Sequence, residues 1–248
     1  MEPCMSSSTP GSEPLSITEK EIARVKDLLP TTLLWSAKRI TGLRGGRGAV
    51  DNPVQFRDQS RQWPTIESGI SSHHYLRYVF AASLASGRTL DAACGCGYGS
   101  SMLFRKTRDV TGVDYNLEAI DWATKYFDGP KYLHAKIEDS PWAGDFKTVV
   151  SLETIEHIQN PGPSLRVLRS ACAGEFIASV PNEELYKFNA EHFKNDESPH
   201  FRHYTPAEFE QLLNDHHFRV TGKFCQKSKG EPEVIEGTDG KFLIYVCS

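Results

Sequence analysis

The stretch Arg88-Thr-Leu-Asp-Ala-Ala-Cys-Gly-Cys-Gly-Tyr-Gly-Ser100 decides the fold. Its first part, from Thr89 to Cys94, is a short and mostly apolar run, typical of a strand buried in a parallel sheet. Three glycines then alternate with other residues, and a helical pattern follows them (Gly95, Gly97 and Gly99). A strand, a glycine-rich turn and a helix form the first unit of a nucleotide-binding α/β fold, because the glycines let a ligand approach the backbone and the helix points its first amides at it.

The spacing of the glycines does not match a dinucleotide site. The dinucleotide fingerprint reads G-x-G-x-x-G, whereas the third glycine of this chain comes one residue early. Asp91 lies on the strand before the turn, which suits a ligand whose near end carries an ammonium group. A second acid, Asp114, ends the next strand 19 residues after Gly95, where a carboxylate can accept hydrogen bonds from both hydroxyls of a ribose.

These two segments, Asp91–Gly99 and Val113-Asp114, resemble the first and second motifs of the class I, Rossmann-like S-adenosylmethionine-dependent methyltransferases. The resemblance covers about residues 72–247 and implies an α/β fold: a seven-stranded, mostly parallel sheet with helices on both faces and a terminal antiparallel hairpin. It also implies S-adenosylmethionine as the cofactor, held by residues of the two motifs (Asp91, Cys94, Gly95, Gly97, Gly99 and Asp114). The alternative, a glycine-rich turn without a ligand, leaves the entropic cost of the glycines with no structural return.

Two further segments extend the expected cofactor site. His74, Arg77 and Tyr78 match an H-x-x-R-Y segment found before the first strand in a bacterial subgroup of the family. This match implies that Arg77 pairs with the cofactor carboxylate, and an ordinary surface arginine is the alternative. Where relatives bind adenine, Lys136 replaces the usual acid, so the backbone amide of Ile137 is the remaining expected contact.

The catalytic residues are expected at the end of the strand Phe146–Leu152, because ligands bind outside the carboxyl ends of parallel strands. Glu153, Glu156 and His157 follow at i, i+3 and i+4, which on a helix is one face. Such a group can bind Mg²⁺, Mn²⁺ or Zn²⁺, or supply a general base, and capping or ion-pair roles for the acids are the alternative. The E-x-x-E-H pattern resembles the ubiquinone-pathway O-methyltransferases and the small-RNA 3′-terminal 2′-O-methyltransferases.

Residues 183–204 form an insertion rich in histidine and aromatic residues, which we expect to lie over the strand ends as a lid for the acceptor. The segment Ser198–Thr205 resembles the lead into the following helix in bacterial methyltransferases encoded with surface-glycan enzymes. This resemblance implies a functional role for His200. His200 joins His157 and Glu153 as a catalytic candidate, with a packing or surface role as the alternative.

The composition limits the class of protein and the kinds of partner that we expect. The 248 residues include 28 basic and 32 acidic side chains, and a net charge of −4 argues against a nucleic-acid partner. The six cysteines form no C-x-x-C pair and no run approaches about 18 apolar residues, so we expect a reduced, cytoplasmic protein without a membrane span. We expect a disordered tail over residues 1–15, a helical extension and linker over 16–69, and the methyltransferase domain over 70–248.

These observations predict an S-adenosylmethionine-dependent methyltransferase that acts on an oxygen of a small-molecule or glycan-type acceptor. The sulfonium methyl is already electrophilic, so the protein mainly has to align acceptor, methyl and sulfur. Two alternatives stay open. One is a metal-dependent RNA 2′-O-methyltransferase that uses Glu153, Glu156, His157 and His200, and the other is a cofactor-binding protein without activity. The sequence does not predict the oligomeric state.

Overall fold

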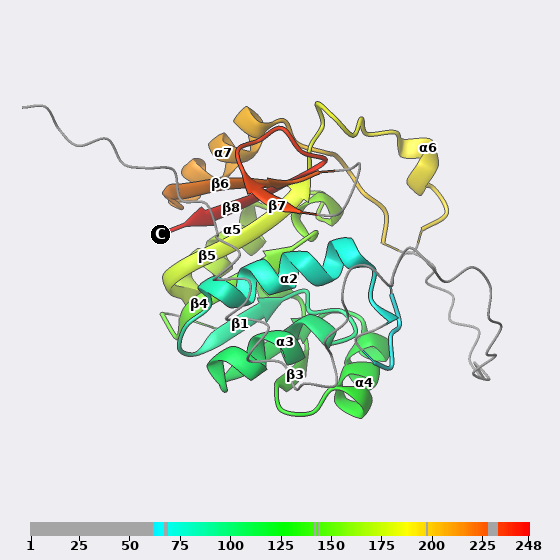
Figure 1. Ribbon diagram of the computed structural model, residues 1–248, viewed down its shortest axis with the longest axis vertical. Helices are drawn as coiled ribbons and strands as arrows, with labels where there is room; N and C mark the ends of the chain where they lie inside the picture. Colours follow the sequence, from blue (N-terminus) through cyan, green and yellow to red (C-terminus); the bar gives the residue numbers. More distant parts are fainter. Residues whose placement is uncertain (1–61, 67–68, 141, 143, 197, 228–232) are drawn as a thin grey trace, which may run out of the picture.

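The computed structural model describes residues 62–66, 69–140, 142, 144–196, 198–227 and 233–248. The predicted tail and nearly all of the predicted extension, residues 1–61, lie outside these ranges. The described part is an α/β fold built on one sheet (Figure 1).

The sheet contains eight strands in the order β3-β2-β1-β4-β5-β8-β6-β7. Neighbouring strands among β1 to β5 run parallel, and β8 runs antiparallel to both β5 and β6. The strands are β1 (Thr89–Ala92), β2 (Val110–Asp114), β3 (Lys131–His134), β4 (Phe146–Leu152), β5 (Cys172–Pro181), β6 (Val220–Gln226), β7 (Val234–Glu236) and β8 (Phe242–Cys247). The predicted mostly parallel sheet with a terminal antiparallel hairpin is therefore confirmed.

The predicted number of strands is one too low. The additional strand, β7, is a three-residue segment that pairs antiparallel with the end of β6 at the sheet edge. It lies in the long connection between the two strands of the predicted hairpin. Three residues are too few for an alternating pattern to stand out from a polar connection, so tertiary pairing alone defines this strand.

The described helices are α2 (Ser72–Leu84), α3 (Tyr98–Thr107), α4 (Leu117–Tyr126), α5 (Gly162–Ala171), α6 (Ala190–Phe193) and α7 (Pro206–Asp215), with 3₁₀ turns η4 (Ile137–Asp139) and η5 (Ile155–His157). Among them, α4, α6 and α7 begin with a side-chain cap. The Asn116 side chain accepts a 3.0 Å hydrogen bond from Ala119 N at the start of α4. Thr205 and Glu208 form a capping box at the start of α7. No described helix is both long enough and apolar enough to cross a membrane.

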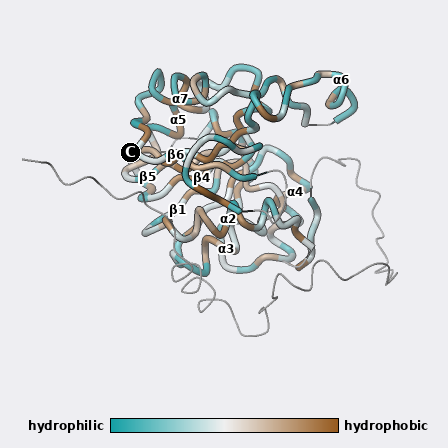
Figure 2. The backbone as a smooth tube through the Cα atoms, turned by 45° about the horizontal axis from the view of Figure 1, so that its top comes forward, coloured by the Kyte–Doolittle hydropathy of each residue, from teal (hydrophilic) through white to brown (hydrophobic). Residues whose placement is uncertain are grey.

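Each face of the sheet carries its own hydrophobic core, which confirms the predicted helices on both faces. Val149 packs with side chains of α5 and α7, whereas its neighbour Val150 packs with side chains of α2 and α3. This alternation is the two-residue period of a strand that is buried on both sides. In Figure 2 the strands at the centre are largely hydrophobic and the outer segments largely hydrophilic.

The parallel strands bring the expected site residues to one edge of the sheet. Asp114 ends β2, Glu153 follows β4, and Asn182 follows β5. The insertion over residues 183–204 leaves this edge and returns to it, since Asn182 and Tyr204 form a parallel bridge at its base. Between these two points the chain extends outward to α6, away from the body of the protein (Figure 1).

Candidate active site

The glycine turn has the strained backbone that its sequence predicts, but the third glycine serves packing. Gly95 and Gly97 have φ angles of 53° and 83°, a region that glycine enters without steric cost. A Cβ on Gly99 would lie 2.0 Å from the ring of Tyr78. Gly99 therefore makes room for a tyrosine, a role that the sequence did not predict. Ala93 also lies in the left-handed region, at φ 60°, at a cost of about 1–2 kcal/mol.

Asp91 lies buried beneath this turn and accepts two side-chain hydrogen bonds. Ser100 Oγ donates to Asp91 Oδ2 at 2.6 Å, and the Tyr78 hydroxyl donates to Oδ1 at 3.1 Å. Burial raises the pKa of Asp91 to about 7, and the two hydrogen bonds oppose that shift. The carboxylate oxygens have acceptor capacity beyond these two bonds, so Asp91 can receive an ammonium group from a ligand.

Asp114 ties the glycine turn to the next helix. Its Oδ2 accepts a 2.9 Å hydrogen bond from Gly95 N, and its Oδ1 accepts a 2.8 Å bond from Asn116 N. Cys94 continues the sheet beside it, since its N–H donates to Val113 O at 2.9 Å. Burial raises the pKa of the Cys94 thiol well above its usual range, which makes a nucleophilic role for this residue unfavourable. Ile137 begins η4, with its side chain buried.

Arg77 is not a surface arginine. Its side chain is 2% exposed, and its Nη1 donates to Gln226 Oε1 at 2.7 Å. Gln226 in turn donates from Nε2 to His73 O at 3.1 Å, so a residue of β6 holds the arginine of α2. The Nη2 atom lies 4.0 Å from Glu153 Oε2, and the guanidinium lies 4.5 Å from the centroid of the Phe242 ring. Arg77 thus links α2 and β6 to Glu153, which follows β4.

Glu153 does not share a helix face with Glu156 and His157, which corrects the predicted geometry. Its φ angle is 52°, and the 3₁₀ turn begins two residues later, at Ile155. The N–H of Glu153 donates to Ser179 O at 3.1 Å and to Ser179 Oγ at 3.0 Å, while Ser179 Oγ donates to Glu153 Oε1 at 2.7 Å. A left-handed glutamate costs about 1–3 kcal/mol, and the contacts with Ser179 hold it in place.

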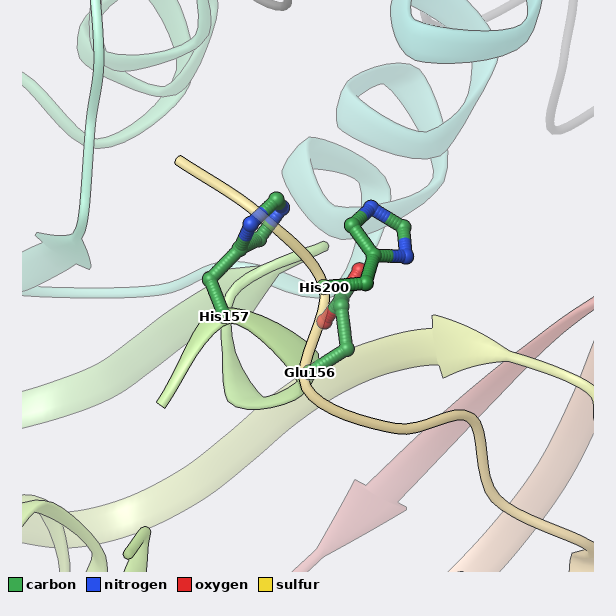
Figure 3. Close-up of side chains that lie close together, drawn as sticks. All are labelled: Glu156, His157 and His200. Atoms are coloured by element: carbon green, nitrogen blue, oxygen red, sulfur yellow. The ribbon is translucent and has the colours of Figure 1, made fainter. Parts of the chain in front are cut away.

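Glu156, His157 and His200 form a compact group at this edge (Figure 3). One potential ligand atom from each residue lies within 4.8 Å of the others. Glu156 and His157 come from η5, whereas His200 comes from the insertion. The insertion is fixed to η5 by a 2.8 Å hydrogen bond from Phe201 N to Glu156 O. Of the residues predicted to bind metal, Glu156 and His157 belong to this group, His200 joins them, and Glu153 lies apart with Ser179.

Glu156 carries a buried carboxyl group whose desolvation its own backbone and Arg77 offset only in part. The residue is fully buried, and neither carboxyl oxygen has a hydrogen-bond partner in the described part of the chain. Burial, followed by the nearby Glu153, raises the pKa of Glu156 well above its usual range. A divalent cation would supply the missing partner, and one carboxylate with two imidazoles is a donor set that suits zinc, iron or manganese. The residues therefore fit a metal ion.

The two histidines of the group are held by neighbouring residues of the insertion. His157 Nδ1 lies 3.2 Å from Ser198 Oγ, and the His157 and His200 rings meet edge to face with centroids 4.4 Å apart. His200 Nδ1 lies 2.8 Å from His203 Nε2, and its ring stacks on Phe193. Burial lowers the pKa of His200 to about 3, so its imidazole is neutral near pH 7. Ser179, Gln226 and His203 have no predicted role, because the sequence does not show which residues they contact in the fold.

Fold and site together define a nucleotide-binding α/β protein with a polar, metal-compatible group beside the ligand turn. A family model described as a methyltransferase domain matches residues 70–222. The chain belongs to this family and is an S-adenosylmethionine-dependent methyltransferase, as predicted.

The relatives at sequence level are distant. A probable S-adenosylmethionine-dependent methyltransferase of Mycolicibacterium smegmatis is 27% identical over 197 residues, which cover 77% of this chain and 69% of the relative. A ubiquinone biosynthesis O-methyltransferase of Psychrobacter cryohalolentis is 28% identical over 154 residues, or 54% of this chain and 60% of the relative. The match thus spans less than two thirds of the second protein.

Solved structures agree on the fold. A possible histamine N-methyltransferase from Thermotoga maritima superposes with a TM-score of 0.60 at 19% identity, covering 71% of this chain and 89% of that one. The magnesium protoporphyrin IX methyltransferase from Synechocystis, with bound S-adenosylhomocysteine, gives a TM-score of 0.54 at 15% identity, covering 71% and 82%. Identities this low show a shared fold and leave the acceptor open.

Proposed function

We propose that this methyltransferase methylates an oxygen atom of a small-molecule or glycan-type acceptor, at a site that binds a divalent cation. The observation that carries the proposal is the group of Glu156, His157 and His200, with its buried carboxyl group that has no hydrogen-bond partner among the described residues. A hydroxyl acceptor has to lose a proton as it is methylated, and neutral imidazoles, a carboxylate or a cation can promote that loss. The similarity to ubiquinone biosynthesis O-methyltransferases supports the same assignment.

Each expected cofactor residue is assigned to one chemical group of S-adenosylmethionine. We assign the ammonium group to Asp91 and the carboxylate to Arg77, which is already oriented by Gln226. Asp114 accepts the ribose hydroxyls, the amide of Ile137 contacts the adenine, and the turn that starts at Cys94 approaches the ligand through its backbone. When bound, the cofactor supplies an electrophilic methyl group.

The residues around the acceptor align the hydroxyl and move its proton. Glu156, His157 and His200 hold the cation, and the lone pairs of the two imidazoles are then occupied. Glu153 remains as the group that accepts the hydroxyl proton, because Ser179 holds its carboxylate outside the metal group. The part of the insertion that carries His200 packs against η5 beside Glu156 and His157, where it limits the access of water to these groups.

The test combines cofactor binding with methyl transfer. The full chain, dialysed against EDTA, is titrated with S-adenosylhomocysteine and is then assayed with methyl-labelled cofactor on phenolic, glycan and RNA 3′-end acceptors, with and without added Mn²⁺. We expect saturable binding without metal, and Mn²⁺-dependent labelling of an oxygen acceptor. Transfer that is independent of Mn²⁺ would contradict the proposal.

The remaining outcomes of the same assay are equally informative. Labelling confined to RNA ends would favour the RNA 2′-O-methyltransferase, and cofactor binding without turnover on any acceptor would favour a non-catalytic protein. His192→Ala is the matched control variant, because His192 is an exposed histidine of the same insertion outside the metal group. It should behave as the wild type, whereas Glu156→Gln should lose the response to Mn²⁺.

A further inference from the structure

Two histidines of the insertion form a hydrogen-bonded chain that ends on a backbone carbonyl. His203 Nδ1 lies 2.6 Å from Tyr186 O, and His203 Nε2 lies 2.8 Å from His200 Nδ1. His203 is 3% exposed, so water does not replace either partner. The chain therefore connects the protein backbone directly to a residue of the Glu156, His157 and His200 group.

The hydrogen atoms in this chain follow from what each group is able to do. A carbonyl oxygen only accepts, so Nδ1 of His203 must carry the hydrogen that faces Tyr186 O. In a neutral imidazole the other nitrogen is then an acceptor, which makes Nε2 of His203 receive a hydrogen bond. His200 Nδ1 must donate that bond. His203 is buried, and burial disfavours a charged imidazole.

Aromatic packing fixes the plane of each ring, and the hydrogen bonds fix which ring atom occupies each position. The His200 ring stacks on Phe193 with centroids 4.1 Å apart and planes 9° apart. Phe188 and Phe193 both contact the His203 ring near edge to face, with centroids 5.5 and 5.9 Å away. A ring flip of either histidine would exchange a nitrogen for a carbon in the hydrogen-bonded chain and break it.

We propose that His203 is a positioning residue that holds His200 in the Nδ1–H tautomer, so that the lone pair of His200 is on Nε2. Nε2 is then the atom that His200 offers to a cation or to the acceptor proton. The assignment of the tautomer is independent of the proposed function, and only the use of Nε2 rests on it. The sequence pattern identifies His200 as a candidate, but it does not show whether Nδ1 or Nε2 carries the hydrogen.

The tautomer can be measured directly on the metal-free protein. The full chain is labelled with ¹⁵N, dialysed against EDTA, and examined by two-bond ¹H–¹⁵N correlation spectroscopy of the histidine rings. His200→Gln and His203→Gln variants assign the signals by loss. We expect both His200 and His203 to carry hydrogen on Nδ1 and none on Nε2. A His200 ring with hydrogen on Nε2 would overturn the proposal, whatever the protein methylates.

Two variants test whether His203 determines the tautomer of His200. His203→Phe keeps a ring beside Phe188 and Phe193 and removes both hydrogen bonds, so His200 should shift toward the Nε2–H tautomer. The affinity for Mn²⁺, titrated alone by calorimetry, should fall about 10–100-fold, as is usual when the N–H partner of a ligating histidine is lost. The affinity for S-adenosylhomocysteine should not change.

His203→Gln is the rescue variant, because its amide oxygen can accept from His200 and its amide nitrogen can donate to Tyr186 O. It should keep the wild-type tautomer and most of the Mn²⁺ affinity, which a role in packing alone would not explain. An unchanged His200 tautomer in His203→Phe, with unchanged Mn²⁺ affinity, would refute the role of His203. If that variant does not fold, the wild-type spectrum and His203→Gln still decide the question.

Discussion

The cofactor side and the acceptor side of this site differ in how their charged groups are satisfied. On the cofactor side, Asp91 and Asp114 accept short hydrogen bonds from hydroxyls and backbone amides that lie within 19 residues of them. On the acceptor side, Glu153 has a left-handed backbone and Glu156 is buried without a partner in the described ranges. The first side is stable as it stands. We propose that a cation or an acceptor completes the second side.

The largest expected effect is a loss of cofactor affinity, and it should occur in a variant of the cofactor side and not in a variant of the acceptor side. Asp114→Ala removes the acceptor of Gly95 N and Asn116 N together with the expected ribose contact, so we expect the affinity for S-adenosylhomocysteine to fall about 100-fold. His157→Ala should lower turnover and leave that affinity nearly unchanged. Calorimetric titration of both variants measures the difference. Equal loss of cofactor affinity in the two variants would remove the distinction between the sides.

The second prediction concerns the buried carboxyl group of Glu156. At pH 8 in EDTA, Glu156→Gln should be more stable to urea than the wild type by about 2 kcal/mol, because it replaces a buried carboxyl group that has no partner with a neutral amide. Mn²⁺ at 100 times its dissociation constant should stabilise the wild type by about 2.7 kcal/mol and leave the variant unchanged. If the variant were less stable in EDTA, Glu156 would have a structural partner in the protein.

The third prediction uses the pKa of Asp91, which is about 7 in the free protein because the group is buried. An ammonium group on the ligand favours the ionised carboxylate, so binding should release a proton and strengthen as pH rises through 7. S-adenosylhomocysteine should bind about tenfold more tightly at pH 8 than at pH 6. Titrations at both pH values in two buffers measure affinity and proton release, and Asp91→Asn should show neither trend. A flat profile in the wild type would place the ammonium elsewhere.

The difference between the cofactor side and the acceptor side also explains which features of the protein could be predicted from its sequence. The cofactor side depends on contiguous residues, since a strand, a glycine turn and an acid at the end of the next strand have local signatures. The fold and the family were therefore predicted correctly. The acceptor side depends on pairs such as His157 and Ser198, which are 41 residues apart, and no local pattern joins them.

Backbone conformation accounts for the rest of the difference. The spacing of Glu153, Glu156 and His157 predicts one helix face, but a single left-handed residue at Glu153 separates it from the other two. His200 was found through a resemblance, whereas His203, three residues later, matters only because the insertion folds back on itself. The individual roles of the site residues stay predictions until variants are measured.

The smallest expected effect is a change in kcat for a variant of the acceptor side. It tests whether Ser179 orients Glu153 without affecting the binding of the cofactor. Ser179 Oγ both accepts from Glu153 N and donates to its carboxylate, so Ser179→Ala removes both hydrogen bonds and leaves Arg77, 4.0 Å away, as the side-chain partner of the strained glutamate. Loss of one hydrogen bond to a charged group costs about 1.5 kcal/mol, and we expect kcat to fall about tenfold. The KM for S-adenosylmethionine should stay within about twofold, because the hydrogen bonds of the Ser179 side chain go to Glu153. Ser179→Thr keeps the hydroxyl and should recover most of the rate. If kcat stayed at the wild-type level, the backbone alone would hold Glu153 in place, and its strained conformation would not depend on the neighbouring strand's side chain.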